Sequence, residues 1–395
     1  MTDIAERLEE LRESGLQRRL RLVQSPQGPR VLLDGRDVLL LCSNDYLGLA
    51  GHPRIRTAAA EAAMRWGAGS GSARLIAGNM PPHLDLERRL AEFKGYGSAL
   101  LFGSGYLANT GTIAALAGRG EVIFSDELNH ASIVDGCRLS RAETFIYRHG
   151  DVEHLAWGLR EAGARAALIV SDGLFSMDGD VAPLAELSEL ARRHSCRLLV
   201  DEAHATGTLG PGGRGSVAAA GLSGEVDVVV GTLGKALGSY GAYVCTDAEL
   251  TEYLLNAARA FVFSTAPPPP AVAAAQAALE LLEAHPERVE RVAINAATLR
   301  RALAAEGLPV ADSGTQIVPL AIGDAGLTMS LCERLLEGGV FAQGIRPPTV
   351  PAGTSRLRFS VTAAHRRAEL ESAAELVGET ARDLGLFANP TPLAA

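Results

Sequence analysis

The chain has 395 residues, of which 47% are hydrophobic and 21% charged, proportions typical of a globular protein with room for two domains. Its formal net charge of −9 leaves no basic surplus to neutralise phosphates, which argues against nucleic acid as the main partner. Five scattered cysteines without a CxxC pair predict neither a disulfide framework nor a metal site. The sequence shows no apolar leader and no run of 18 apolar residues, so we expect a cytoplasmic protein with no membrane partner.

The N-terminal 50 residues predict a helix followed by a hairpin. Apolar residues recur at helical spacing over residues 3–22, which predicts an amphipathic helix. Two short apolar runs, 31–33 and 38–41, then flank the pair Asp34-Gly35, which is typical of a tight turn between two strands.

From about residue 54 onward, short apolar runs alternate with helical stretches. Such alternation indicates a largely parallel sheet that is covered by helices on both faces. The seven candidate strands are residues 99–102, 121–124, 144–147, 167–171, 197–200, 226–230 and 243–245.

The C-terminal part follows a proline run at residues 266–270, which we expect to form neither helix nor central strand. An Ala-rich helix is expected at 271–284, and short strands at 317–321 and 356–361 indicate a small α+β domain. The last residues, 389–395, are expected to be frayed. The predicted parts are an N-terminal helix and hairpin segment, a large domain and a small C-terminal domain, at residues 1–50, 51–284 and 285–395.

The segment DVVVGTLGKALGSYG, residues 227–241, presents one lysine, Lys235, in a Gly-rich turn after an apolar strand. No charged residue other than this lysine lies between positions 228 and 245. Desolvation in such a setting disfavours the ammonium form and eases Schiff-base formation. The alternative is a lysine that snorkels at the edge of a sheet.

The segment RLLVDEAHATG, residues 197–207, places Asp201 at the end of an apolar strand. Ligands of open α/β sheets bind outside the carboxyl ends of the strands, so Asp201 could pair with the protonated ring nitrogen of pyridoxal phosphate. His204 could then hydrogen-bond the phenolic oxygen of that cofactor. The alternatives are a helix N-cap for Asp201 and a histidine satisfied within the core.

The segment ALLFGSGYLANTG leads from a strand through residues 103–105 into a helix, whose free backbone N–H groups would hold a phosphate. The same segment reads as GxGxxA, ending at Ala108, with Asp126 about twenty residues further on. This pattern supports a rival interpretation, an NAD-dependent dehydrogenase. The rival is weakened because the motif starts near residue 100 and leaves the lysine and the aspartate without a role.

Three further residues follow strands and have two interpretations each. The imidazole of His130 could stack on a flat cofactor ring or simply be solvated. Ser176, in FSMDGD, is a turn-forming serine unless a cofactor is present, and Thr232 could donate to a phosphate or cap a turn. Taken together, a phosphate cradle, a flat ring, an acid and a lysine at successive strand ends favour a pyridoxal-phosphate site.

These segments resemble the α-oxoamine synthases, which are pyridoxal-phosphate enzymes of fold-type I. The resemblance extends from SNDYLGL (43–49) to SRLRFSVTAAH (355–365). It implies a mostly parallel seven-stranded sheet in a large domain with a smaller α+β C-terminal domain. The other matching blocks are GSGSARLIAG (69–78), LNHASI (128–133), GLFSMDGD (173–180), DEAHATGTLGPGGRG (201–215), GTLGKALGSYGAYV (231–244) and IRPPTVPAGTSRLR (345–358).

The resemblance also implies a role for each matching residue. Lys235 would form the Schiff base, Asp201 would pair with the pyridinium, and His130 would stack on the ring. His204 would contact the phenolic oxygen. A homodimer with shared active sites is implied, because Ser264 or Thr265 would contact the cofactor of the neighbouring subunit. The remaining cofactor-binding positions implied are Gly105, Tyr106, Ser176 and Thr232.

On the substrate side, the resemblance implies that Arg358 holds the amino-acid carboxylate in a bidentate pair. Asn44 and Thr349 match substrate-contact positions. An N-terminal arginine, Arg18 or next Arg21, would meet the far carboxylate of the acyl chain, although the family often has an arginine where this chain has glutamine, directly after a Gly-Leu pair.

Within the family, IRPPTVPAGTSRLR and DEAHATG are most typical of the branch that condenses L-alanine with a pimeloyl thioester in biotin biosynthesis. That reaction is a C-acyl transfer with loss of carbon dioxide, and its acyl donor is carried by coenzyme A or by a carrier protein. The alternatives within the family are branches that join glycine to an acetyl or succinyl thioester.

Overall fold

The computed structural model describes residues 3–387, so the end that was expected to be frayed, 389–395, lies outside it. The chain forms two compact units. The small unit comprises Met1–Gly48, Met177–Gly179 and Glu290–Ala395, and the large unit comprises Leu49–Ser176 and Asp180–Val289. The predicted division at residues 50 and 284 stays a prediction.

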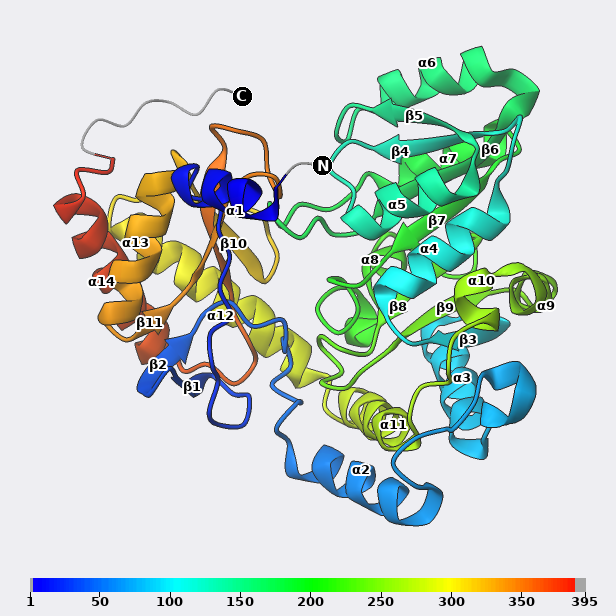
Figure 1. The fold of residues 1–395 in the computed structure, drawn as a ribbon, viewed down its shortest axis with the longest axis horizontal. Coiled ribbons are helices and arrows are strands. Elements are labelled where there is room, and N and C mark those ends of the chain that lie inside the picture. The colour runs from blue at the N-terminus through cyan, green and yellow to red at the C-terminus, as the bar shows by residue number, and fades with distance from the viewer. Residues whose placement is uncertain (1–2, 388–395) are drawn as a thin grey trace. The chain divides into compact units, whose positions relative to one another are not determined.

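The large unit is built on a seven-stranded sheet, which confirms the predicted fold class (Figure 1). The strand order is β3-β9-β8-β7-β6-β4-β5; β9 runs antiparallel to both its neighbours, and all other neighbours are parallel. Each strand overlaps a predicted one. The strands are β3 (Ser98–Phe102), β4 (Val122–Asp126), β5 (Glu143–Tyr147), β6 (Ala166–Asp172), β7 (Arg197–Asp201), β8 (Val228–Thr232) and β9 (Ala242–Thr246).

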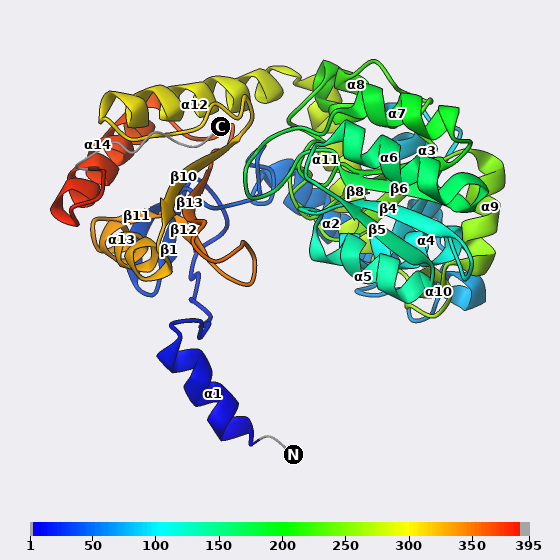
Figure 2. The same ribbon diagram turned by 90° about the horizontal axis from the view of Figure 1, so that it is seen from above.

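Helices cover both faces of this sheet, which explains why its central strands read as unbroken apolar runs. Figure 2 shows α4 (Gly105–Leu116) and α5 (Ala131–Ser140) along one face, and α6 (Val152–Ala162) and α7 (Leu184–Arg193) along the other. The remaining helices of this unit are α2 (Pro53–Trp66), α3 (Pro81–Lys94), α8 (Ser216–Ala219), α9 (Ala248–Ala257), α10 (Arg259–Val262) and α11 (Pro269–Ala284), with short helical turns at Arg74–Gly78, Gly163–Arg165 and Pro211–Gly213.

The prediction that residues 266–270 exclude helix is wrong at its C-terminal end. Helix α11 begins at Pro269, so Pro269 and Pro270 occupy its first turn. Proline is tolerated there because the first N–H groups of a helix have no intrahelical acceptor. Pro268 stays extended, with φ −67° and ψ 137°, and precedes the helix as its N-cap.

The small unit contains two three-stranded sheets. The predicted hairpin is confirmed as β1 (Arg30–Leu33) and β2 (Arg36–Leu40), with Asp34 and Gly35 at φ 48° and 82° in the turn. The first sheet is completed by β11 (Val340–Phe341), parallel to β2. The second sheet has the order β10-β13-β12, and its members are β10 (Ile317–Gly323), β12 (Gln343–Ile345) and β13 (Ser355–Ser360). The helices are α12 (Glu287–Ala305), which starts in the large unit, α13 (Ala325–Glu337) and α14 (Arg367–Asp383).

The first helix is shorter than predicted. Helix α1 spans Ile4–Glu13 instead of residues 3–22, and Gly15 leaves the helical region with φ 66°. No residue of α1 is buried, and Figure 2 shows it projecting from the rest of its unit. Within residues 3–387, none of the helices has both the length and the apolar character required to cross a membrane.

Candidate active site

Lys235 lies in a tight turn between β8 and β9. The N–H of Leu233 donates to the carbonyl of Gly241 across the base of this turn. Leu233 and Ala236 are buried, whereas Lys235 is only partly buried. The turn therefore anchors the backbone on both sides of the lysine and leaves its side chain accessible.

The amine of Lys235 lies next to a histidine, and the chain has few other lysines that could react in its place. Its Nζ lies 2.8 Å from Nε2 of His204. The chain contains only two lysines, and the other, Lys94, is enclosed in an ion pair with the fully buried Glu202. Among the lysines, Lys235 alone is therefore placed to react with an aldehyde.

Asp201, the last residue of β7, is buried and receives two hydrogen bonds. Its Oδ2 accepts from Nδ2 of Asn109 at 2.6 Å, and its Oδ1 accepts from the N–H of Ala203 at 2.7 Å. Both oxygens act as acceptors, as in an ionised carboxylate. A carboxylate held in this way fits the predicted partner of a protonated ring nitrogen.

His130 precedes α5 and caps its N-terminus. The N–H of His130 donates to Oδ2 of Asp172 at 2.7 Å. Burial lowers the pKa of His130, and the nearby Lys235 lowers it further, while Asp201 acts in the opposite direction. Burial also raises the pKa of Asp172 well above its ordinary 3.8, with Asp201 adding to the effect. The four residues predicted to be catalytic thus lie close together, in the large unit.

The start of α4 has the features of a phosphate cradle. Ser104 caps the helix by accepting from the N–H of Leu107 at 3.2 Å. Within the described residues, the N–H groups of Gly105 and Tyr106 have no acceptor, and a Cβ added at Gly105 would meet no atom within 4 Å. An anion can therefore approach this helix end, where the dipole favours it.

The dinucleotide alternative does not fit the topology. A dinucleotide fingerprint needs its first strand inside a parallel sheet, but β3 lies at the sheet edge and pairs only with the antiparallel β9. Asp126 is also occupied: it accepts from the N–H of Gly150 at 3.0 Å and from Nδ1 of His149 at 3.0 Å. The other ring nitrogen of His149 lies 2.8 Å from Asp180, so Asp126 serves a local polar cluster.

The other predicted cofactor contacts are placed as follows. The hydroxyl of Thr232 donates to the Gly241 carbonyl at 3.2 Å and accepts from the N–H of Gly234 at 3.1 Å, so it caps the lysine turn. Ser176 is half-buried in the loop after β6, and Tyr106 is exposed, with its hydroxyl bonded to Asp135. Their contacts with a cofactor stay predictions.

Ser264 and Thr265 lie in the segment between α10 and α11. Thr265 forms an isolated β-bridge with Ala73, and the N–H of Ala266 donates to the carbonyl of Ser72 at 3.0 Å. Two segments far apart in the sequence are thereby joined. The contact of Ser264 or Thr265 with the cofactor of a neighbouring subunit remains a prediction.

In the small unit, the structure brings together two predicted substrate residues, Arg358 and Asn44. Arg358 on β13 is buried, and its NH1 and NH2 lie 3.4 Å and 3.3 Å from Oδ1 of Asn44. Its NH2 also lies 3.3 Å from the hydroxyl of Tyr46, which sequence analysis did not identify. Neutral oxygens of Asn44 and Tyr46 thus contact the guanidinium.

Arg18 and Thr349 line a second feature of the small unit, a cavity of about 540 Å³. Arg21, the second choice for the acyl carboxylate, pairs with Glu333 there. Within the described residues, Arg18 has no acidic partner, and Arg346, which also lines the cavity, donates only to Sδ of Met329 and to a backbone carbonyl. Among the described residues, neither Arg18 nor Arg346 forms an ion pair, and the one carboxylate that lines the cavity, Glu333, pairs with Arg19 and Arg21.

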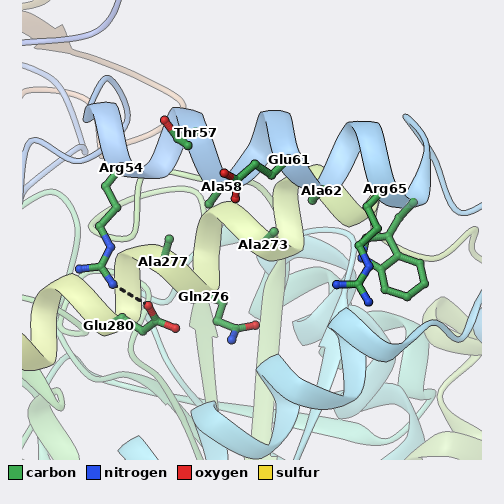
Figure 3. Close-up of a pocket in the computed structure, with 11 residues that line it drawn as sticks. Arg54, Thr57, Ala58, Glu61, Ala62, Arg65, Ala273, Gln276, Ala277 and Glu280 are labelled. Carbon is green, nitrogen blue, oxygen red and sulfur yellow. Dashed lines mark hydrogen bonds and ion pairs between the residues drawn. The ribbon is translucent and has the colours of Figure 1, made fainter.

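A second cavity lies in the large unit, away from the predicted residues. It lies between α2 and α11 of the large unit, over a floor of alanines, and Arg54 on α2 reaches across it to Glu280 on α11 at 2.8 Å (Figure 3). None of the predicted site residues lines it. Within residues 3–387, no group of three or more His, Cys, Asp or Glu side chains is placed to bind a metal ion.

The residues of the large unit fit pyridoxal phosphate. The amine of Lys235 suits its aldehyde, Asp201 suits its ring nitrogen, and the open N-terminus of α4 suits its phosphate. Sequence analysis missed Asn109 and Ser132, which join Asp201 to His130, because each is an ordinary polar residue within a helix. The scarcity of lysine was a usable signal for Lys235.

Comparison with known proteins supports this interpretation. Residues 36–377 match the family model described as aminotransferase class I and II. The chain is 52% identical, over 97% of its length and 99% of the relative, to an 8-amino-7-oxononanoate synthase of Geobacter sulfurreducens, and 54% identical, over 93% and 92%, to one of Anaeromyxobacter dehalogenans.

Solved structures give the same result. A lysine-to-alanine variant of a serine palmitoyltransferase of S. paucimobilis, with a bound aldimine of pyridoxal phosphate and myriocin, aligns with a TM-score of 0.91 at 35% identity, covering 97% of each chain. An 8-amino-7-oxononanoate synthase of Francisella tularensis aligns with a TM-score of 0.77 at 28% identity, covering 88% of this chain and 99% of that one. The chain therefore belongs to the class I and II aminotransferase family and, within it, to the α-oxoamine synthases, which are pyridoxal-phosphate enzymes of fold-type I.

Proposed function

We propose that this enzyme condenses L-alanine with a pimeloyl thioester and releases carbon dioxide, forming 8-amino-7-oxononanoate for biotin biosynthesis. The geometric observation that carries the choice of acyl donor is the cavity with Arg18, Arg346 and Thr349, since two guanidinium groups that form no ion pair within the described residues suit a chain that ends in a carboxylate. Relatives 48–54% identical, over 92–100% of their lengths, carry the name of that activity.

When bound, pyridoxal phosphate supplies an electron sink for negative charge at the α-carbon of the amino acid. We assign Lys235 as its covalent anchor and Asp201 as the partner of its ring nitrogen. His130 would lie against the ring, and His204 would meet the phenolic oxygen. The phosphate contacts assigned are the N–H groups of Gly105 and Tyr106, the hydroxyls of Ser176 and Thr232, and Ser264 or Thr265 of the partner subunit.

Arg358 would bind the carboxylate of alanine. Asn44 and Tyr46 contact its guanidinium, and a guanidinium can bind a carboxylate through two parallel N–H groups, which would fix the orientation of the substrate. Because that carboxylate is the group lost as carbon dioxide, its orientation decides which bond of the α-carbon is broken. Arg358 would thus both bind the amino acid and orient the bond that is broken.

The α-proton of alanine would go to Nζ of Lys235. A base must reach the proton it removes, and the amine beside Nε2 of His204 is the accessible basic nitrogen of the lysine turn. The α-carbon then bonds to the thioester carbonyl carbon, and the thiol leaves with a proton. Loss of carbon dioxide and addition of a proton at the α-carbon complete the reaction.

Two further assignments extend this proposal. A homodimer with shared active sites is supported by the family resemblance at Ser264 and Thr265. A cytoplasmic location is supported by the cysteines: all five are free, and four of them are buried. Free thiols of this kind are typical of reducing compartments.

The central assignment is tested by the variant Lys235→Ala. The purified protein should lose the yellow absorbance of the bound cofactor and its activity, whereas Arg88→Met, a control at an exposed position of the large unit, should keep both. Borohydride reduction followed by peptide mapping should place the adduct on Lys235. An adduct on Lys94, or none, would refute the assignment.

Substrate choice is tested by measuring thiol release from four acyl donors, pimeloyl, succinyl, acetyl and palmitoyl thioesters, each with alanine, glycine or serine. We expect the highest kcat/KM for alanine with the pimeloyl donor. A preference for glycine would overturn the proposed reaction and leave family membership intact. A preference for serine with the palmitoyl donor would show that the arginine-lined cavity does not select the acyl chain.

A further inference from the structure

The imidazole of His130 is contacted at Nδ1 by a single residue, Ser132. The backbone N–H of Ser132 donates to Nδ1 at 3.2 Å, and the hydroxyl of Ser132 lies 2.7 Å from the same atom. A ring nitrogen that accepts from a backbone N–H carries no proton. The proton of a neutral His130 is therefore on Nε2.

The hydroxyl of Ser132 has its direction fixed from the other side by Asn109. One amide hydrogen of Asn109 goes to Asp201 at 2.6 Å, and the other goes to Oγ of Ser132 at 2.9 Å. The carboxylate of Asp201 can only accept, so the amide cannot be flipped without placing its oxygen against that carboxylate. Since Nδ1 of His130 already accepts from the backbone N–H of Ser132 and carries no proton, the hydrogen of the Ser132 hydroxyl lies in the 2.7 Å contact with Nδ1, while Oγ accepts from Asn109.

This chain from Asp201 through Asn109 and Ser132 to His130 is enclosed. Asn109 is fully buried, and Ser132 and Asp201 are exposed by 1% and 4%. Hydrogen bonds in such an environment are not exchanged with water and polarise one another. Burial and the charge of Lys235 lower the pKa of His130, which agrees with a neutral ring.

We propose that Asn109 and Ser132 are positioning residues that hold His130 as a neutral imidazole with its proton on Nε2, so that the ring can donate a hydrogen bond from Nε2 and does not act as the base. The inference rests on the proposed active site. Protonation of Nδ1 would displace two donors at once, and Nε2 already carries its proton. Removal of the α-proton is thereby left to Lys235.

The tautomer can be observed directly by NMR. The enzyme is labelled with ¹⁵N in its histidine rings, and the signals of His130 are identified by their loss in His130→Gln. We expect one protonated and one bare ring nitrogen, with the proton on Nε2, in both the cofactor-free and the cofactor-loaded protein near neutral pH. A proton on Nδ1, or a doubly protonated ring, would overturn the inference.

Two pairs of variants test the cause. Ser132→Ala removes the hydroxyl donor and should raise the pKa of His130 and lower kcat/KM by about tenfold, as expected when an orienting hydrogen bond is lost. Ser140→Ala is its control, because Ser140 is a buried serine of the same helix that bonds only to local backbone. Ser132→Thr keeps the hydroxyl and should retain the wild-type tautomer and pKa.

The second pair is Asn109→Leu with Thr112→Val as control, both at buried positions in α4. Without Asn109, the hydroxyl of Ser132 is no longer held in place, while the backbone N–H of Ser132 still donates to Nδ1; the proton should therefore stay on Nε2 and the pKa of His130 should rise. Thr112→Val should leave the ring unchanged. If both Ser132→Ala and Asn109→Leu retain the wild-type tautomer and pKa, the proposed relay is wrong.

The NMR result is independent of the substrates. If the ring has its proton on Nε2 and responds to Ser132→Ala, while alanine and the pimeloyl donor prove inactive, the substrate proposal fails and the relay stands. If the condensation proceeds but Ser132→Ala leaves the ring and kcat/KM unaltered, the relay alone fails.

Discussion

Replacing Lys94 with methionine should destabilise the large unit by about 3–5 kcal/mol, the cost of leaving a buried charge without its partner. Lys94 is the last residue of α3, and its ammonium contacts the carboxylate of Glu202, the carbonyl of Arg214 and, at 3.3 Å, the hydroxyl of Thr206. The side chains of Lys94 and Glu202 are 2% and 0% exposed. Water therefore cannot replace the missing ammonium.

The other hydrogen bonds of Glu202 determine how much of the lost stability is recovered when its charge is removed as well. Its Oε1 accepts from the hydroxyl of Ser216 at 2.9 Å and from the N–H of Val217 at 2.6 Å, and these bonds survive in Lys94→Met. The double variant Lys94→Met with Glu202→Gln removes both charges and keeps an acceptor. It should therefore be less destabilised than the sum of the single variants by about 2 kcal/mol.

Urea unfolding followed by tryptophan fluorescence is a suitable assay, because both tryptophans, Trp66 and Trp157, lie in the large unit with the ion pair. The control is Arg88→Met, which breaks an exposed pair with Glu92 in the same helix and should cost less than about 1 kcal/mol. A Lys94→Met cost equal to that of the control, or additive single variants, would refute the reasoning.

Three further outcomes are expected. The pKa of His149 is raised from 6.5 to about 10 by its hydrogen bonds to two carboxylates, so its contribution to stability is fully present below about pH 6.5 and is lost as the pH rises towards 10. The difference in unfolding free energy between wild type and His149→Gln, measured by urea unfolding, should therefore shrink between about pH 6.5 and about pH 10. A constant difference would contradict the assignment. Gly158→Ala places a Cβ 2.6 Å from the ring of Phe145 and should cost about 1–3 kcal/mol in thermal unfolding, whereas Gly69→Ala, which meets no atom within 4 Å, should be nearly neutral. Arg346→Gln should raise KM for the pimeloyl thioester by about tenfold or more and leave KM for alanine unchanged; an equal rise for an acetyl thioester would show that no acyl carboxylate is bound there.

In the small unit, local sequence signals predicted the hairpin correctly and the length of the first helix wrongly. The hairpin prediction is correct because a two-residue turn needs positive φ at both of its residues, and the pair Asp34-Gly35, which favours that conformation, can be recognised from two adjacent positions. Helix α1 is too long in the prediction because apolar spacing continues to Leu20, although Gly15 ends the helix. Apolar periodicity reports which residues share a face and does not detect a left-handed residue that interrupts it.

Partners that lie far apart in the sequence could not be paired from the sequence. Asn109 meets Asp201 across 92 positions, and Lys94 meets Glu202 across 108. Lys94, at the end of a helix, has the pattern of a common surface residue that complements the helix dipole. These contacts arise only in the folded chain, where Asn109 on α4 reaches Asp201 on β7 and Lys94 on α3 reaches Glu202.

The adjacent acids of the DEAH segment show why the sequence alone assigns only one of them. Asp201 and Glu202 follow each other in extended backbone, since the N–H of Glu202 still donates to the carbonyl of Val230 on β8 at 2.7 Å. Successive side chains of a strand point to opposite faces, so Asp201 meets Asn109 while Glu202 meets Lys94. The pleat thus separates Asp201, which is proposed to pair with the cofactor, from Glu202, which forms a buried ion pair. The buried ion pair between Lys94 and Glu202 therefore fixes the residue that directly follows Asp201.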